Sequence, residues 1–316
     1  MHTATEPAVV VAGDAFVDLT STTSATGGPA YEPHPGGSCL NVAVGLARQG
    51  VPTSLLARVS TDGFGTLLRR HLAASGVRDQ HLIATTDLTG LAVADLTDGQ
   101  AGYSFHTAGS ADRGLRPEDV SMARSGFPAA AALHLGSVAL IQEPQASTLV
   151  GLLRDESGRR LISLDPNVRP SLIPDRGHFL ESLADWVGLC DVVKVSEEDL
   201  AWCYPGESAA SVAERWVELG AALVVVTSGA DGAWGRTTTA TAQVRTPEVA
   251  VVDTVGAGDA FTAGMLAEFY RAGRLTRGGV ESLDSRALTR VLQAAAAVAA
   301  DTCTRAGAEP PVRAPR

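Results

Sequence analysis

Short runs of β-branched and apolar residues alternate along this chain with longer segments of helical character. This alternation is typical of a parallel sheet covered by helices. The run Leu223–Val226 is apolar without interruption, which favours a strand buried on both faces. The predicted strands are Val9–Ala12, Thr53–Arg58, Ala131–Leu135, Leu161–Asp165, Val192–Lys194, Leu223–Thr227 and Val249–Val251. The predicted helices are Asn41–Gln49, Gly65–Ser75, Gln145–Ser157, Ser208–Leu219, Ala257–Arg271 and Ser285–Thr302.

Two stretches interrupt this alternation and predict a second, smaller sheet. Residues 14–35 are rich in Thr, Ser, Gly and Pro and lack a helical period. Residues 88–107 alternate between apolar and polar positions around Asp98-Gly99, a pair typical of a β-hairpin turn. We therefore expect one α/β domain over residues 1–316, with β insertions at about 15–35 and 88–107.

The composition of the 316 residues, 45% hydrophobic and 19% charged, is that of a globular protein. A net charge of −10, without a block of Lys or Arg, argues against a nucleic-acid partner or an anionic membrane. The apolar stretches are too short to cross a bilayer, and no secretory signal is recognised, so we expect a cytoplasmic protein. The four cysteines lack metal-ligand spacing and are interpreted as reduced thiols.

The most informative segment runs from a predicted strand into a predicted helix at residues 251–261. Gly256, Ala257 and Gly258 carry no bulky side chain, so an anion can approach the backbone N–H groups at the helix start. Asp259 follows in the first turn, where a carboxylate could accept the proton of an attacking hydroxyl. The pattern suits phosphoryl transfer. Taken alone, so short a motif favours capping aspartates and a tight turn instead, because short glycine motifs often match by chance.

Several segments together resemble one enzyme family. Asp253–Asp259 resembles the second signature of the ribokinase-like (PfkB) carbohydrate kinases, and Pro35–Ala43 their first. Other family motifs are matched in the same order along the chain by Gly13–Asp18, Ser60–Gly65, Asp165–Arg169, Lys194–Asp199, Thr227–Gly232 and Cys303–Ala308. The resemblance implies a ribokinase-like three-layer α/β fold, with a central, mostly parallel sheet and a small β lid. It also implies an ATP-dependent kinase that phosphorylates a hydroxymethyl group of a small sugar.

The resemblance assigns roles to residues of this sequence. Asp259 would be the general base, with the backbone of Gly256, Ala257 and Gly258 as the anion hole. The implied sugar contacts are Asp18, Gly36, Gly37, Asn41, Phe105 and Arg169. The implied ATP contacts are Lys194, Ser196, Thr227, Gly229, Gly232, Gly256, Gly258 and Ala297. Other interpretations are a surface ion pair for Lys194, a loop salt bridge for Arg169 and ordinary core packing for the Ala-rich helix.

The same resemblance implies cations and a partner. Mg²⁺ would bridge the ATP phosphates, held through water by Asp199, with Glu198 as a neighbouring rival for this role. Some members use a monovalent cation beside the anion hole, so K⁺ near Asp253 and Val255 is a hypothesis. Lid sheets often mediate dimerisation in this family, which favours a homodimer.

Substrate identity is the least constrained point. Ser38 and Phe16 stand where ribose-specific members carry Lys and Asn. Thr107 stands where fructokinases and ketodeoxygluconate kinases commonly carry Arg, and the absence of this Arg argues against a carboxylated sugar. These differences favour a fructose-like sugar. The alternatives are 2-keto-3-deoxygluconate, ribose, an adenosine-like nucleoside, or a sensor of sugar or nucleotide that keeps the fold without turnover.

Overall fold

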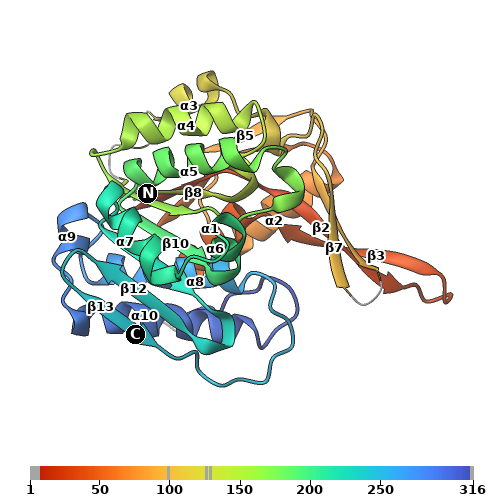
Figure 1. Cartoon of the computed structure of the whole chain (residues 1–316). Helices are drawn as coiled ribbons and strands as arrows, with labels where there is room; N and C mark the ends of the chain where they lie inside the picture. The colour runs from red at the N-terminus through yellow and green to blue at the C-terminus, as the bar shows by residue number, and fades with distance from the viewer. Residues whose placement is uncertain (1–7, 98–99, 125–126, 128–129, 314–316) are drawn as a thin grey trace.

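The computed structural model describes residues 8–97, 100–124, 127 and 130–313. Within this part of the chain, a nine-stranded sheet has the order β13-β12-β11-β10-β9-β8-β1-β4-β5 (Figure 1). Its strands are β1 (Val9–Ala12), β4 (Thr53–Ser60), β5 (Leu82–Thr85), β8 (Ala132–Gly136), β9 (Leu161–Asp165), β10 (Val192–Ser196), β11 (Leu223–Thr227), β12 (Ala233–Thr237) and β13 (Thr241–Val244). In this sheet, β5, β4, β1, β8, β9, β10 and β11 pair in parallel, and β12 and β13 add an antiparallel edge.

Six of the seven predicted strands are present, and Val249–Val251 is not one of them. That segment lies in a loop after β13, where Val251 is 63% exposed. The hairpin β12–β13 occupies the edge of the sheet instead. A short apolar run is therefore insufficient evidence for a strand when no neighbouring strand is available to pair with it.

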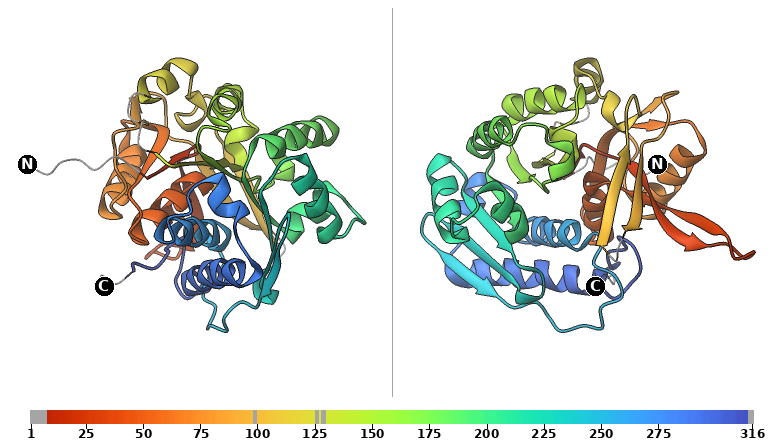
Figure 2. Two further views of the ribbon diagram at one scale, coloured as in Figure 1. Left: turned by 90° about the vertical axis from the view of Figure 1, so that its left-hand side faces the viewer. Right: turned by 45° about the vertical axis from the view of Figure 1, so that its right-hand side comes forward.

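Helices cover both faces of the sheet, giving three layers (Figure 2). Val9 and Val11 of β1 belong to one core cluster, whereas Val10 and Ala12 belong to the other, because successive side chains of a strand point to opposite faces. The first cluster packs under α1 (Ser38–Arg48), α2 (Gly63–Ala74), α8 (Ala257–Arg271), α9 (Arg277–Glu281) and α10 (Ser285–Thr302). The second packs under α3 (Pro117–Arg124), α4 (Gln145–Glu156), α5 (Arg176–Leu189), α6 (Glu197–Cys203) and α7 (Ala209–Leu219).

All six helices that were predicted from the sequence are present. α8 and α10 have the bounds expected from the sequence, and α1, α2, α4 and α7 differ from the predictions by one to three residues at an end. α3, α5, α6 and α9 were not predicted. α5 has a helical signal that was missed, because Asp175 caps its N-terminus and Phe179, Leu183, Trp186 and Val187 are buried at helical spacing. None of the described helices is long and apolar enough to cross a membrane.

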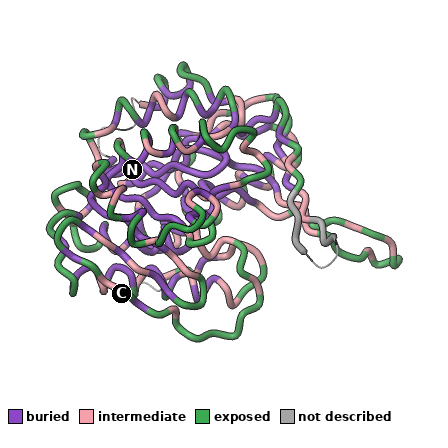
Figure 3. The backbone as a smooth tube through the Cα atoms, viewed as in Figure 1, coloured by how far each residue is buried: buried purple, intermediate pink, exposed green. Residues whose placement is uncertain are grey.

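The two insertions form a separate four-stranded sheet with the order β3-β2-β6-β7. Its strands are β2 (Phe16–Thr23), β3 (Pro29–Gly36), β6 (Leu91–Thr97) and β7 (Gln100–His106). The predicted hairpin is confirmed by the antiparallel pairing of β6 with β7, while its turn at Asp98-Gly99 lies outside the described residues. This sheet projects from the body, and the far ends of β2 and β3 are largely exposed (Figure 3). Its near ends, at Phe16 and Gly36, adjoin the start of α1.

Candidate active site

Two cavities meet at the start of α8. The first, of about 360 Å³, lies under the small sheet and is lined by residues that include Asp18, Asn41 and Asp259. The second, of about 560 Å³, lies between the loop after β11, the loop after β13 and α10. Thr254, Ala257 and Gly258 line both cavities. A molecule in one cavity would therefore face a molecule in the other across the N-terminus of this helix.

The turn that starts α8 is held by its glycine and by a neighbouring aspartate. Gly256 has φ +75°, and a Cβ there would lie 2.5 Å from the Cβ of Ala308, so only glycine fits without strain. The carboxylate of Asp253 accepts hydrogen bonds from the N–H groups of Val255 (3.0 Å) and Gly307 (2.8 Å). The first turn of the helix thus presents its N–H groups and the positive end of its dipole to the cavities.

Asp259 is buried and accepts two side-chain hydrogen bonds. Ser38 donates through Oγ to Oδ1 at 2.7 Å, and Asn41 donates through Nδ2 to Oδ2 at 2.8 Å. Burial raises the pKa of Asp259 to about 6, while these two hydrogen bonds act in the opposite direction. A carboxylate of this kind is ionised near neutral pH and is still basic enough to accept a proton.

A buried ion pair lies on the other side of the helix start. Lys194 on β10 donates to Asp165 at the end of β9 at 2.9 Å, and both side chains are at most 5% exposed. Burial opposes the charge of Lys194, but Asp165, Asp199 and Asp259 together raise its pKa above the ordinary value. A Cβ on Gly258 would lie 3.0 Å from Nζ of Lys194. The ammonium group therefore faces the anion-accepting turn, and the surface ion pair considered from the sequence is wrong.

This constellation can be compared with known proteins. The profile of the pfkB family carbohydrate kinases matches residues 7–315. The chain belongs to this family. It is therefore a phosphotransferase that acts on a sugar hydroxyl.

Relatives and solved structures agree with this membership. A fructokinase from Rhizobium leguminosarum bv. trifolii is 36% identical over 280 residues, which are 89% of this chain and 85% of that protein. The structure of a fructokinase with bound ATP from Xylella fastidiosa has a TM-score of 0.87 and 29% identity, covering 96% of this chain and 94% of that one. A fructokinase from Vibrio cholerae O395 in a form with fructose, ADP and calcium ion has a TM-score of 0.80 and 29% identity, covering 95% and 94%.

The residues predicted to contact the sugar surround the first cavity. Gly37, Asn41, Phe105 and Arg169 line it together with Asp18. Burial, and then the charges of Asp14 and Asp259, raise the pKa of Asp18 to about 7, against the opposing effect of Arg169. The cavity wall also includes residues that were not assigned to the site from the sequence: Asp14, Phe16, Ser38, Ser137, Val138 and Asn167.

Two glycines and two aromatic rings shape the first cavity and its surroundings. Gly36 does not line the cavity, but a Cβ there would lie 2.2 Å from Oδ2 of Asp18, so this glycine makes room for the carboxylate. Gly37 has φ +102° and precedes α1. The rings of Phe16 and Phe105 meet edge to face, with their centroids 6.2 Å apart.

Three of the residues predicted to contact ATP, Thr227, Gly229 and Gly232, line the second cavity. Its far wall comes from Ala296, Ala299 and Ala300 of α10. Ala297, the residue predicted for this wall, is exposed and does not line the cavity, so that prediction is wrong by one helical position. Ser196 does not line it either; its Oγ accepts from the N–H of Asp199 and caps α6.

Of the two acidic residues considered for the metal, Asp199 is buried and Glu198 is exposed. Oδ1 of Asp199 accepts from the N–H of Val168 at 3.1 Å. Burial and then the charge of Asp165 raise the pKa of Asp199. Among the described residues, no group of three or more His, Cys, Asp or Glu side chains could hold a metal ion by itself.

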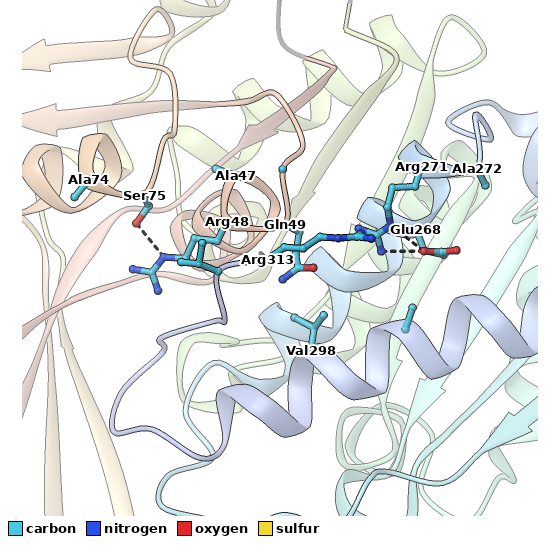
Figure 4. Close-up of a pocket in the computed structure, with 13 residues that line it drawn as sticks. Ala47, Arg48, Gln49, Ala74, Ser75, Glu268, Arg271, Ala272, Val298 and Arg313 are labelled. Carbon is cyan, nitrogen blue, oxygen red and sulfur yellow. Dashed lines mark hydrogen bonds and ion pairs between the residues drawn. The ribbon is translucent and has the colours of Figure 1, made fainter. Parts of the chain in front are cut away.

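A larger hollow, of about 1140 Å³, lies at the C-terminal ends of α1 and α8 (Figure 4). It is lined by the last residues of α1 and α8 and by the C-terminal segment. Arg48 pairs with Glu309, and Arg271 pairs with Glu268 at 2.8 Å. Because these two arginines already have acidic partners, we assign no chemistry to this hollow.

Proposed function

We propose that this protein is an ATP-dependent sugar kinase that phosphorylates a hydroxymethyl group of a small neutral sugar, fructose-like in preference, with Asp259 as general base. The observation that carries the proposal is the position of Asp259 where the two cavities meet. A sugar hydroxyl in the first cavity would lie between this carboxylate and a phosphate at the start of α8. The whole chain would act as one domain, with the small sheet as its lid.

The proposed reaction is a direct, in-line transfer. The sugar oxygen forms a bond to the γ-phosphorus of ATP while its O–H bond breaks and the proton passes to Asp259. The bond from the γ-phosphorus to the β–γ bridging oxygen breaks, and ADP leaves with the electron pair. The N–H groups around Gly256–Gly258 and the Lys194 ammonium stabilise the negative charge on the phosphoryl oxygens.

The nucleotide is proposed to occupy the second cavity. Ala296, Ala299 and Ala300 give this cavity an apolar wall of small side chains that an aromatic base could pack against, and Thr227, Gly229 and Gly232 also line it. The known ATP-bound fructokinase structure, at a TM-score of 0.87, supports ATP as the phosphoryl donor. Ser196 would act through the cap of α6 and not as a contact.

The charges around the first cavity favour a neutral sugar. Asp14, Asp18 and Asp259 supply three carboxyl groups, and Arg169 supplies one cation. Nη1 of Arg169 is already bonded to oxygens of Asn167 and Val168. A carboxylated sugar would thus meet repulsion, whereas the hydroxyls of a ketose can donate to these carboxylates. The fructokinase names of the relatives at 31–36% identity agree with this choice.

Two cations are part of the proposal. The oxygens of Asp199 are hard ligands that suit Mg²⁺ through a bridging water, and the metal would supply charge neutralisation at the phosphates. Beside the anion hole, Asp253 joins the turn before α8 to the turn at Gly307 and places the backbone near Val255 where K⁺ is proposed. An equal rate in K⁺-free buffer and after addition of K⁺ would reject the monovalent site.

Homodimerisation through the small sheet is also proposed. The hairpin of β2 and β3 extends beyond the body (Figure 1). Tyr31 on β3 is 51% exposed. Light scattering should give twice the mass of one chain, and the mass of a single chain would contradict the dimer. The cytoplasmic location expected from the sequence stays a prediction.

The substitution Asp259→Asn tests the assignment of the base. The amide keeps the shape but cannot accept the proton, so we expect kcat to fall by about 10²–10⁴-fold. The affinity for Mg-ATP, measured by calorimetry, should stay within a few-fold of the unmodified kinase. Near-normal turnover of this variant would refute the role of Asp259.

A further inference from the structure

A chain of hydrogen bonds joins the sugar cavity to the carboxylate at the start of α8. Arg169 donates through Nη1 to Oδ1 of Asn167 at 2.7 Å, and Asn167 donates through Nδ2 to Oγ of Ser38 at 3.0 Å. Ser38 in turn donates to Oδ1 of Asp259 at 2.7 Å. We propose that Ser38 and Asn167 are positioning residues, and that together with Arg169 they hold the Asp259 carboxylate where it receives the sugar's proton. The proposal rests on the proposed function, because it concerns the same base.

Arg169 sets the donor and acceptor roles in this relay of hydrogen bonds, which runs from Arg169 through Asn167 and Ser38 to Asp259. A guanidinium has donors and no acceptor, so the atom of Asn167 that faces it must be the amide oxygen. The NH₂ group of Asn167 then points at Ser38 and occupies a lone pair of its hydroxyl oxygen. The hydroxyl proton of Ser38 is left to point at Asp259. Arg169 does not contact Asp259, but through Asn167 it makes the Ser38 hydroxyl donate its hydrogen bond to Asp259.

A second residue of α1 holds the other carboxylate oxygen of Asp259. Asn41, one turn after Ser38 on α1, donates to Oδ2 of Asp259 at 2.8 Å. With one donor on each oxygen, the plane of the carboxylate is fixed, and each oxygen keeps a lone pair for a further donor. The sugar hydroxyl therefore meets an ionised carboxylate in one orientation, which is the preorganisation that a proton transfer requires.

The backbone of Asn167 is shaped for this contact. Its φ is +40°, a left-handed conformation that costs a non-glycine residue roughly 1–2 kcal/mol. The N–H of Asn167 donates to Oδ1 of Asp165 at 3.2 Å, which holds the turn after β9. Asp165, the partner of Lys194, and Asn167, a member of the relay, both lie in the segment Asp165–Arg169. This segment therefore positions both the Asp259 carboxylate and the Lys194 ammonium group.

Other titratable groups around Asp259 also influence its pKa. Asp165 on β9 and Lys194 on β10 act on it electrostatically. Asp14, in the loop before β2, and Asp18, on β2, line its cavity, and the buried thiol of Cys39 on α1 is within electrostatic reach. Burial raises the pKa of Asp259 to about 6, and the Ser38 hydrogen bond opposes that rise. Loss of the relay should therefore raise the pKa further.

The pH dependence of kcat distinguishes positioning from sugar binding. At saturating Mg-ATP and sugar, titration of the nucleotide contributes equally to every variant, so differences report on the protein. Ser38→Ala should move the acid limb of the kcat profile upward by roughly one to two pH units, the scale of a hydrogen bond to a charged group. Ser38→Thr keeps the hydroxyl and should restore the original limb.

Two further variants test the distant members of the relay. Asn167→Gly removes the amide while tolerating the positive φ, so it deletes the contact without strain. Arg169→Ala leaves the Asn167 amide free to turn its oxygen toward Ser38. Both should shift the acid limb in the direction of Ser38→Ala. Ser54→Ala, which deletes a buried hydroxyl bonded to His81 away from the site, is the control and should leave the limb in place.

The outcomes separate this proposal from the proposed function. An unmoved acid limb in folded Ser38→Ala, with Asp259→Asn inactive, would overturn the positioning role and leave the base assignment standing. A shift in Ser38→Ala alone, without one in Asn167→Gly and Arg169→Ala, would overturn the relay beyond Ser38. Normal activity of Asp259→Asn would show that Asp259 is not the general base, and would overturn both the proposed function of this residue and the positioning role that depends on it.

Discussion

The buried pair of Lys194 and Asp165 offers a quantitative test of the site. In Asp165→Asn, Oδ1 can still accept from the N–H of Asn167, but Lys194 loses its carboxylate at 2.9 Å. Breaking a buried ion pair by neutralising one partner costs about 3–5 kcal/mol, because the remaining charge is buried without compensation. For a chain of 316 residues, the usual unfolding entropy converts this loss into a Tm lower by about 5–8 °C.

Two additional variants identify the source of that loss. Asp165→Asn combined with Lys194→Met removes both charges and should recover most of the lost stability. Its kcat should remain low, because no ammonium group then faces Gly258. Glu207→Gln breaks an exposed pair with Arg215, whose atoms lie 2.7 Å apart, and should change the stability by less than about 1 kcal/mol.

The assays are thermal unfolding and steady-state ADP release. An unchanged Tm in Asp165→Asn would refute the claim that Lys194 depends on this carboxylate. Normal turnover in the double variant would refute the assignment of Lys194 to the phosphates, even if the stability followed the expected pattern.

Two other substitutions test the glycine turn and a buried carboxylate. Gly256→Ala should lower both Tm and kcat, whereas Gly273→Ala, at φ +64° with open space around it, should show only the backbone cost of roughly 1 kcal/mol; equal losses of kcat in the two variants would contradict the role of the turn. Asp112 is buried with neither oxygen bonded, since Ser110 directs its hydroxyl to Thr107, and burial raises the pKa of Asp112 to about 6. The folded state therefore holds this proton more tightly than the unfolded chain, and stability falls as the pH rises from about 4 to about 6. Asp112→Asn should raise the unfolding free energy at pH 7.5 by up to about 3 kcal/mol, with a gain that vanishes near pH 4 when measured by denaturant titration; a gain independent of pH would contradict the burial argument.

The strands and the helix that carry the site could be predicted because their signals are local. The apolar run of β11 is buried along nearly its whole length, and the glycines before Asp259 fix the start of α8. The partner of Lys194 could not be predicted in the same way. Pairing of Val193 with Leu164 places Lys194 beside Asp165, and that register between β10 and β9 is a tertiary property.

The error at Ala297 has a similar origin. The segment around it is almost all alanine, so the sequence carries no contrast that fixes which side of the helix faces the cavity. The orientation is set by packing against α8, where Gly264 lies close to Ala295 and Val298. The relay from Arg169 to Asp259 was also missed, because its members are on three separate segments of the chain.

The measurement that tests the central claim most directly is ADP release with Mg-ATP across fructose, ribose, 2-keto-3-deoxygluconate, tagatose, inositol and adenosine. The account predicts a clear preference for fructose or a close neutral ketose, and loss of that activity in Asp259→Asn. A preference for 2-keto-3-deoxygluconate would contradict the charge argument for the sugar cavity. Binding of ATP and sugar without any ADP formation across the panel would contradict the assignment as a kinase and favour a sensor.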